Sequence, residues 1–164
     1  MRIAIACCLL VLALLAGGSA TAAPAKTVPQ STYVRLADRI CLDVAQKAVA
    51  LQREARRRVG ASTSDAQTFG IFGEIYRRQL TLIQSMRRRL VALGLPRTGA
   101  VTARALVDGI EEGESALRQL IAATDSRSRS AFTRSAIRYR NVSLASARAV
   151  KRSGLGFTAC GAGA

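Results

Sequence analysis

Histidine and tryptophan are absent from this 164-residue chain, and aromatic residues make up only 4% of it. The absence of histidine removes the usual general base, the usual metal and haem ligand, and Ser/His or Cys/His catalysis in their ordinary forms. Haem-binding and di-iron four-helix bundles are disfavoured for the same reason. We therefore expect no enzyme activity, no catalytic residue, no cofactor and no metal site.

Cysteine is scarce as well. Cys7 and Cys8 lie in an apolar N-terminal segment, so Cys41 and Cys160 are the only cysteines beyond it. An exported chain with one distant pair of cysteines is expected to close it as a disulfide. A redox-active pair would need CxxC spacing and an activated thiolate, and the sequence shows neither. We therefore predict a structural disulfide between Cys41 and Cys160.

The first residues of the chain have the pattern of an export signal. Arg2 supplies a positive start, an apolar run follows over residues 3–16, and small residues come next. The Ala-Thr-Ala tripeptide that ends at Ala22 predicts a signal peptide over residues 1–22, with cleavage after Ala25 as the second choice. The apolar run has roughly 14 residues, whereas a bilayer span needs about 20. We therefore favour cleaved export over an uncleaved N-terminal anchor.

The rest of the chain suits a single helical domain. We expect residues 23–30 to form a tether and residues 31–164 to form one domain with one core. Alanine, leucine, arginine, glutamine and glutamate favour helices, and runs of β-branched residues are missing. The predicted fold class is therefore all-α. The export signal places the mature protein outside the cytoplasmic membrane, secreted or in the cell envelope.

Apolar residues recur at steps of three and four in four consecutive segments, which is the pattern of amphipathic helices. The first of these faces comprises Val34, Ala37, Cys41, Val44, Ala48, Leu51 and Ala55, and the third comprises Leu106, Ile110, Gly113, Leu117, Leu120 and Thr124. Side chains that can accept hydrogen bonds from exposed backbone N–H groups predict the helix starts. These are Ser31 or Thr32, Thr63 or Ser64, Thr98, and Asp125 or Ser126.

Four helices of about 25 residues joined by short loops predict an antiparallel up-down four-helix bundle. An even number of helices returns the chain to its starting end, whereas an odd number leaves the termini nearly 40 Å apart, at about 1.5 Å per residue. A disulfide needs its two Cα atoms within about 7 Å of each other. The bridge between Cys41 and Cys160 and the even number of helices therefore support each other, and we predict a bundle closed by this one disulfide.

Positive charge dominates the chain, with 25 Lys and Arg against 10 Asp and Glu and a net charge of +15. Such a charge attracts anionic lipid, wall polymer or nucleic acid. The alternative is that an Arg- and Ala-rich exported chain reflects a GC-rich genome, in which Arg codons displace Lys. The scarcity of aromatic residues between the cations disfavours stacking on single-stranded nucleic acid. Anionic lipid and wall polymer are therefore the favoured partners, and no small-molecule substrate is indicated.

The predicted bundle would gather part of this charge at the end that holds the disulfide. There the C-terminal ends of the second and fourth helices would lie beside the start of the first helix. If the protein binds an anionic surface, we expect it to use this end. The candidate anion-binding residues are Arg35, Arg39, Arg87, Arg88, Arg89, Lys151 and Arg152.

One acidic cluster interrupts the basic sequence, comprising Asp108, Glu111, Glu112 and Glu114. Its first three members lie on neighbouring faces of the predicted third helix at positions i, i+3 and i+4. A carboxylate metal site or acid/base site is one interpretation, but no other helix supplies obvious partner carboxylates. We favour the other interpretation, in which an acidic helix lies against basic neighbours.

Two short motifs carry a resemblance to known proteins. Ala37-Asp38-Arg39-Ile40-Cys41 and the segment from Gly154 to Cys160 resemble the AD-x-IC opening and G-L…C ending of uncharacterised exported helical proteins of GC-rich actinobacteria. The resemblance implies a helical, exported protein and transfers no catalytic residue. We expect a binding or structural module of the cell envelope, with electrostatic binding to anionic envelope lipid or wall polymer as the alternative.

Overall fold

The computed structural model describes residues 27–161, so the predicted signal peptide, its cleavage site and the first part of the predicted tether lie outside the described residues. It is helical, with only two short strands of two residues each. The elements are β1 (Thr27–Val28), α1 (Gln30–Gly60), α2 (Asp65–Ala92), β2 (Leu95–Pro96), α3 (Ala100–Asp125) and α4 (Arg129–Arg152). The predictions of an all-α fold and of four helices are confirmed.

The second helix begins where the sequence predicts it. Ser64 caps α2, because its hydroxyl accepts a hydrogen bond from the N–H of Gln67 at 3.3 Å. The first helix begins earlier than predicted, at Gln30, directly after Pro29. Residues 27–28, which lie within the predicted tether, pair in parallel with residues 95–96.

The third and fourth helices begin later than predicted. α3 starts after Gly99, whose φ of +81° favours glycine, and not at Thr98. α3 continues through Asp125, one of the two residues predicted to start α4. Ser126, the other, lies at the end of α3, where its hydroxyl donates to the carbonyl of Ala123 at 3.0 Å. Ser128 caps α4 in its place.

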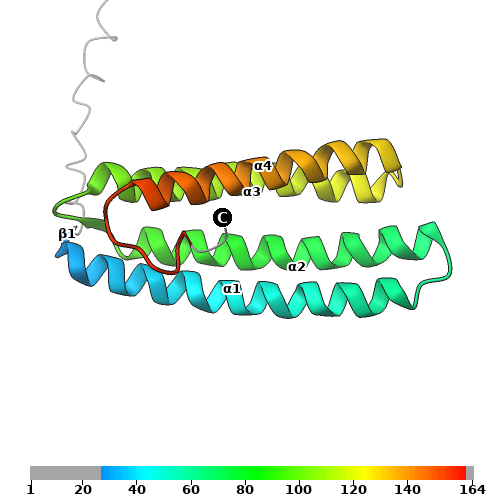
Figure 1. Ribbon diagram of the computed structural model, residues 1–164, viewed down its shortest axis with the longest axis horizontal. Coiled ribbons are helices and arrows are strands. Elements are labelled where there is room, and N and C mark those ends of the chain that lie inside the picture. Colours follow the sequence, from blue (N-terminus) through cyan, green and yellow to red (C-terminus); the bar gives the residue numbers. More distant parts are fainter. Residues whose placement is uncertain (1–26, 162–164) are drawn as a thin grey trace, which may run out of the picture.

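The four helices lie side by side, and each contacts the next along the chain. Figure 1 shows the start of α1, the α2–α3 connection and the end of α4 at one end of the molecule, which we call the tail end. The α1–α2 and α3–α4 loops lie at the opposite end, which we call the loop end. Helices α1 and α4 hardly touch each other. The connection between the first and the last helix therefore depends on long side chains and on the segment after α4.

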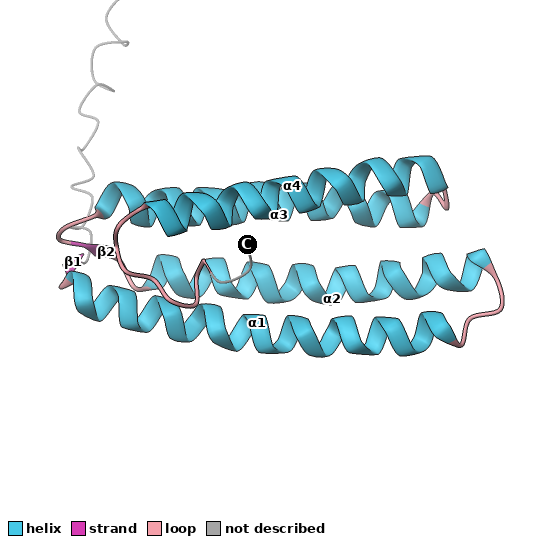
Figure 2. Cartoon of the chain, viewed as in Figure 1, coloured by secondary structure: helices cyan, strands magenta, loops and turns pink. Residues whose placement is uncertain are grey.

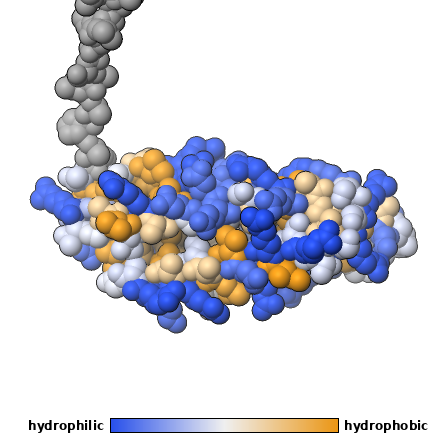
Figure 3. Space-filling view, turned by 90° about the horizontal axis from the view of Figure 1, so that it is seen from above, coloured by the Kyte–Doolittle hydropathy of each residue, from blue (hydrophilic) through white to orange (hydrophobic). Residues whose placement is uncertain are grey.

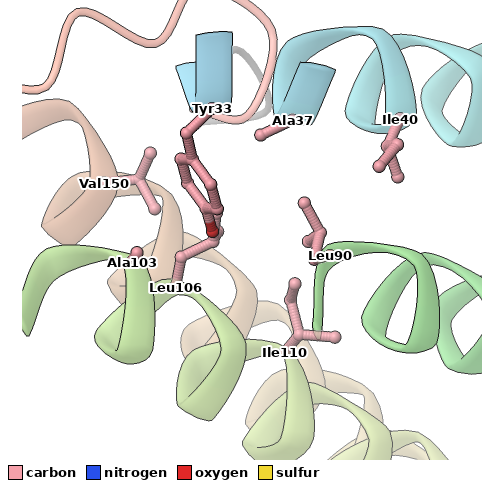
Figure 4. Close-up of a cluster of buried hydrophobic side chains, with 8 residues drawn as sticks. All are labelled: Tyr33, Ala37, Ile40, Leu90, Ala103, Leu106, Ile110 and Val150. Carbon is pink, nitrogen blue, oxygen red and sulfur yellow. The ribbon is translucent and has the colours of Figure 1, made fainter. Parts of the chain in front are cut away.

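The apolar core changes along the length of the helices. At the tail end one cluster takes side chains from all four helices (Figure 4): Tyr33, Ala37, Ile40, Leu90, Ala103, Leu106, Ile110 and Val150. Towards the loop end the core divides into two parts. Leu51, Ala55 and Ile75 pack between α1 and α2, whereas Leu117, Leu120 and Ile121 pack with side chains of α2 and α4. Within residues 27–161, the tail end is therefore the part whose core is shared by all four helices.

The segment after α4, residues 154–160, forms a tail that returns to α1 (Figure 2). Gly154 and Gly156, with φ values of +69° and +81°, allow the reversal. Leu155 is buried and packs against Gly99 at the start of α3. Phe157 meets Tyr33 of α1 edge to face, with ring centroids 6.3 Å apart. The tail therefore docks on α1 and α3 before it reaches the disulfide.

Candidate functional site

Two side chains of α1, one helical turn apart, hold the tail. Cys41 forms the disulfide with Cys160, with Cα atoms 5.1 Å apart. Asp38 Oδ1 accepts hydrogen bonds from the backbone N–H groups of Ala159 and Cys160 at 2.9 and 3.1 Å. Asp38 Oδ2 accepts from the N–H and the hydroxyl of Thr158, both at 2.8 Å. A covalent bond and a four-fold hydrogen-bonded carboxylate therefore fix the same short segment.

The hydrogen bonds also control the charge state of Asp38. Burial alone raises the pKa of its carboxyl group, but the backbone N–H groups of residues 158–160 and the Thr158 hydroxyl lower it. The net effect is a pKa below the usual 3.8. The carboxylate is therefore charged at neutral pH, which makes it a strong acceptor for the tail.

The seven cations predicted as an anion-binding set differ in their surroundings. Arg87 Nε lies 2.7 Å from Glu114 and Arg89 lies 2.6 Å from Asp43, so these two are neutralised within the chain. The other five are exposed and form no ion pair with an acid of the described chain: Arg35, Arg39, Arg88, Lys151 and Arg152. The helix segments that carry them lie towards the tail end in Figure 1.

The acidic cluster separates into one buried and three exposed residues. Glu114 is 1% exposed, and its two oxygens lie 2.7 Å from Arg87 and 3.0 Å from Arg118. Its charge raises the pKa of the Arg87 guanidinium above the usual value. The other three, Asp108, Glu111 and Glu112, are exposed. Sequence analysis missed the burial of Glu114, although its position four residues after Ile110 places it on the predicted inner face.

A cavity of about 300 Å³ lies beside the disulfide. All four helices and the tail contribute to its wall, which is mainly apolar. The lining residues are Cys41, Val44, Ala45, Ile83, Met86, Leu106, Gly109, Ile110, Gly113, Tyr139, Ser143, Ser146, Ala147, Ala159 and Cys160. Sequence patterns gave no sign of this cavity, because it depends on how α1 and α4 are spaced.

The outer surface is mixed in character. Figure 3 shows hydrophobic residues in several separate areas of one face, among hydrophilic residues. Over residues 27–161, no group of three or more His, Cys, Asp or Glu side chains is arranged to hold a metal ion. No helix in the same range combines the length and the apolar character that crossing a membrane requires.

The Asp38 hydrogen bonds predict a pH-dependent contribution to stability. Asp38→Asn should lower the free energy of unfolding by about 1–2 kcal/mol at pH 7, because the amide NH₂ cannot accept a hydrogen bond from the tail. The folded-state pKa of Asp38 is lowered, so its contribution is complete above the usual pKa and disappears as the pH falls through the folded value. Urea unfolding of the oxidised proteins should show a constant difference from pH 7 to about 5, and a shrinking one below.

Asp108→Asn is the control for this experiment, because Asp108 is an exposed carboxylate with no ion pair among the described residues. It should change the free energy of unfolding by less than about 0.5 kcal/mol at every pH. A difference between wild type and Asp38→Asn that persists unchanged at pH 2 would contradict the role of the charged carboxylate.

Because Glu114 is buried and ion-paired, replacing it should destabilise the protein more than the same replacement at an exposed glutamate. Glu114→Gln should lower the free energy of unfolding by about 1–2 kcal/mol, because it replaces the hydrogen bonds of a buried carboxylate to Arg87 and Arg118 by weaker ones to a neutral amide. Glu112→Gln, the same change at an exposed position on the same helix, should cost less than about 0.5 kcal/mol. Equal losses in the two variants, measured by chemical denaturation, would show that the Glu114 pairs do not contribute to stability.

No protein-family model, curated protein or solved structure matches this chain. What the protein does must therefore be inferred from its own residues and their arrangement.

Proposed function

We propose that the chain is an exported helical protein of the cell envelope that acts as a binding or structural module and not as an enzyme. In this proposal its helices form an antiparallel up-down bundle. Short connections between successive helices support that arrangement, as does the packing of each helix on the next. The disulfide between Cys41 and Cys160 supports export, because such bonds persist in oxidising compartments.

The distribution of charge is the observation that carries the proposal. Helix α4 contains seven Arg and Lys residues and no acid. Within the described chain only one of these seven, Arg129, forms an ion pair, and its partner is Asp65. Three unpaired members of the predicted anion-binding set that lie outside α4, Arg35, Arg39 and Arg88, add to this charge at the tail end. Internal ion pairing therefore leaves most of the positive surface available to a partner.

These unpaired cations favour one specific form of binding, which is electrostatic attachment to anionic envelope lipid or wall polymer. A cation near an anionic membrane surface contributes about 1 kcal/mol to binding, and salt screens this contribution. A disulfide-closed frame would hold the cations in a fixed arrangement at a small cost in conformational entropy on binding. Attachment of this kind needs no catalytic group and no cofactor.

Co-sedimentation with lipid vesicles tests the proposal. The oxidised mature protein should sediment with phosphatidylglycerol vesicles and not with phosphatidylcholine vesicles, and binding should weaken steeply as NaCl rises from about 0.05 to about 0.5 M. Replacing Arg35, Arg39, Arg88, Lys151 and Arg152 together by Gln should weaken binding at least about tenfold.

A matched variant removes the same charge from the other part of the molecule. It replaces Arg53, Arg56, Arg57, Arg134 and Arg138, all exposed, by Gln. If the tail end is the binding surface, this variant should bind more tightly than the first. Equal losses would contradict the location of the surface, and sedimentation that does not weaken with salt would contradict the electrostatic mechanism.

A further inference from the structure

The cavity beside the disulfide exists because two helices do not meet. In a closed four-helix bundle the first and fourth helices pack on each other, whereas α1 and α4 hardly touch here. Val44 and Ala45 of α1 line one side of the cavity, and Ser143 and Ala147 of α4 line another. The tail closes one side through Ala159 and Cys160. The space is therefore a seam between α1 and α4 that the tail covers only in part.

The wall of this cavity suits hydrocarbon. Most of its side chains are apolar, and Gly113 of α3 leaves open space in it, because a Cβ built on this glycine meets nothing within 4 Å. Two of the three hydroxyls on its α4 side have partners of their own: Ser143 donates to the carbonyl of Tyr139 at 2.9 Å, and the Tyr139 hydroxyl accepts from Gln79 at 2.9 Å. A volume of about 300 Å³ lies at the lower end of the range of ligand sites, and is about twice that of an apolar cavity that binds benzene.

Exposed apolar residues extend the seam along α1. On α1, Leu42 and Val49 are 51% and 44% exposed. They lie three residues before and four residues after Ala45, on the same helix face as this lining residue. The apolar surface therefore continues outward from the cavity.

Positive charge borders the seam on α4. Arg140 lies next to the lining residue Tyr139 and one heptad before Ala147, so it shares a helix face with Ala147. It is exposed and forms no ion pair among residues 27–161. Asp38 lies three residues before Cys41 on α1, and both of its carboxylate oxygens accept hydrogen bonds from the tail. An apolar site with a cation at its border matches a ligand that has an alkyl chain and an anionic group.

We propose that the seam between α1 and α4, beside the Cys41–Cys160 disulfide, binds a single-chain anionic amphiphile. Its alkyl chain occupies the cavity and its carboxylate or phosphate lies at Arg140. This ligand is taken up as a monomer from solution, so the proposal goes beyond attachment of the protein to an anionic surface and does not depend on it. Other occupants, such as a second copy of the chain, are outcomes of the test.

Isothermal titration of the oxidised mature protein with decanoate, below its micelle concentration, measures the binding. Gly113→Leu is the decisive variant. Gly113 lines the cavity, a Cβ built on it meets nothing within 4 Å, and leucine favours a helix more than glycine does. The leucine side chain should fill the cavity and weaken decanoate binding at least about tenfold without loss of folding.

Gly70→Leu is the matched control, because Gly70 is also a helical glycine with open space around a built Cβ and does not line the cavity. It should change the decanoate affinity by less than about twofold. Gly113→Ala adds a smaller group at the same position and should weaken binding less than the leucine does. This graded pair keeps the test valid if circular dichroism shows that Gly113→Leu does not fold.

A second pair of variants tests the anionic group. Arg140→Gln should weaken the binding of decanoate about threefold and leave that of decan-1-ol unchanged, as expected for one exposed charge pair. Arg134→Gln removes the same charge six residues earlier, on another face of α4, and should affect neither ligand. Sedimentation of Gly113→Leu with phosphatidylglycerol vesicles should equal that of the wild type, which separates this site from surface attachment.

Four results would overturn the proposal. The first is that decanoate does not bind. The second is that decanoate binds Gly113→Leu as tightly as the wild type. The third is that Arg140→Gln weakens the binding of decan-1-ol as much as that of decanoate. The fourth is that sedimentation equilibrium finds a dimer that Leu42→Gln or Val49→Gln dissociates, because a second copy would then cover the seam.

Discussion

The attachment of the C-terminal tail to α1 is the constraint on which the rest of the structure depends. Because the backbones of α1 and α4 hardly approach each other, the first and last helices are joined by the tail and by side chains that they contribute to one apolar cluster. The disulfide from Cys41 links residues 119 positions apart, which restricts the unfolded chain by about 4–5 kcal/mol on the entropy model. The hydrogen bonds of Asp38 fix the same segment one helical turn away. The two attachments together hold the tail over one side of the cavity.

This constraint acts at one end only, and the two ends of the molecule are stabilised differently. At the tail end, all four helices share one apolar cluster. At the loop end α1 packs on α2 alone, and exposed ion pairs connect the two helices, with Arg58 bridging Glu54 and Glu74. Exposed ion pairs contribute little to stability. We therefore expect the tail end to be the more stable part, and a cavity is tolerated there because the disulfide fixes its surroundings.

The fold was largely predictable from the sequence, and the sites were predictable only in part. Helical periodicity gave four helices, and the distance limit for a disulfide favoured an even number of them, in agreement with the Cys41–Cys160 bond. The burial of Glu114 was missed, because a charged residue at an inner position is unusual and its cationic partner lies on another helix. The role of Asp38 was also missed, because its partners are backbone N–H groups 120 residues away, which have no signature in the sequence. The cavity depends on helix spacing, which periodicity does not encode.

Amide hydrogen exchange on the oxidised and the reduced protein tests the central claim most directly. If the tail holds α1 in place, reduction of the disulfide should raise the exchange rate selectively in the first half of α1, residues 33–48, and in the end of α4. The middle of α2 and α3 should keep its protection, because their mutual packing does not involve the tail. Equal exchange of residues 33–48 in the two redox states would contradict the account, because direct helix packing would then be sufficient to hold α1.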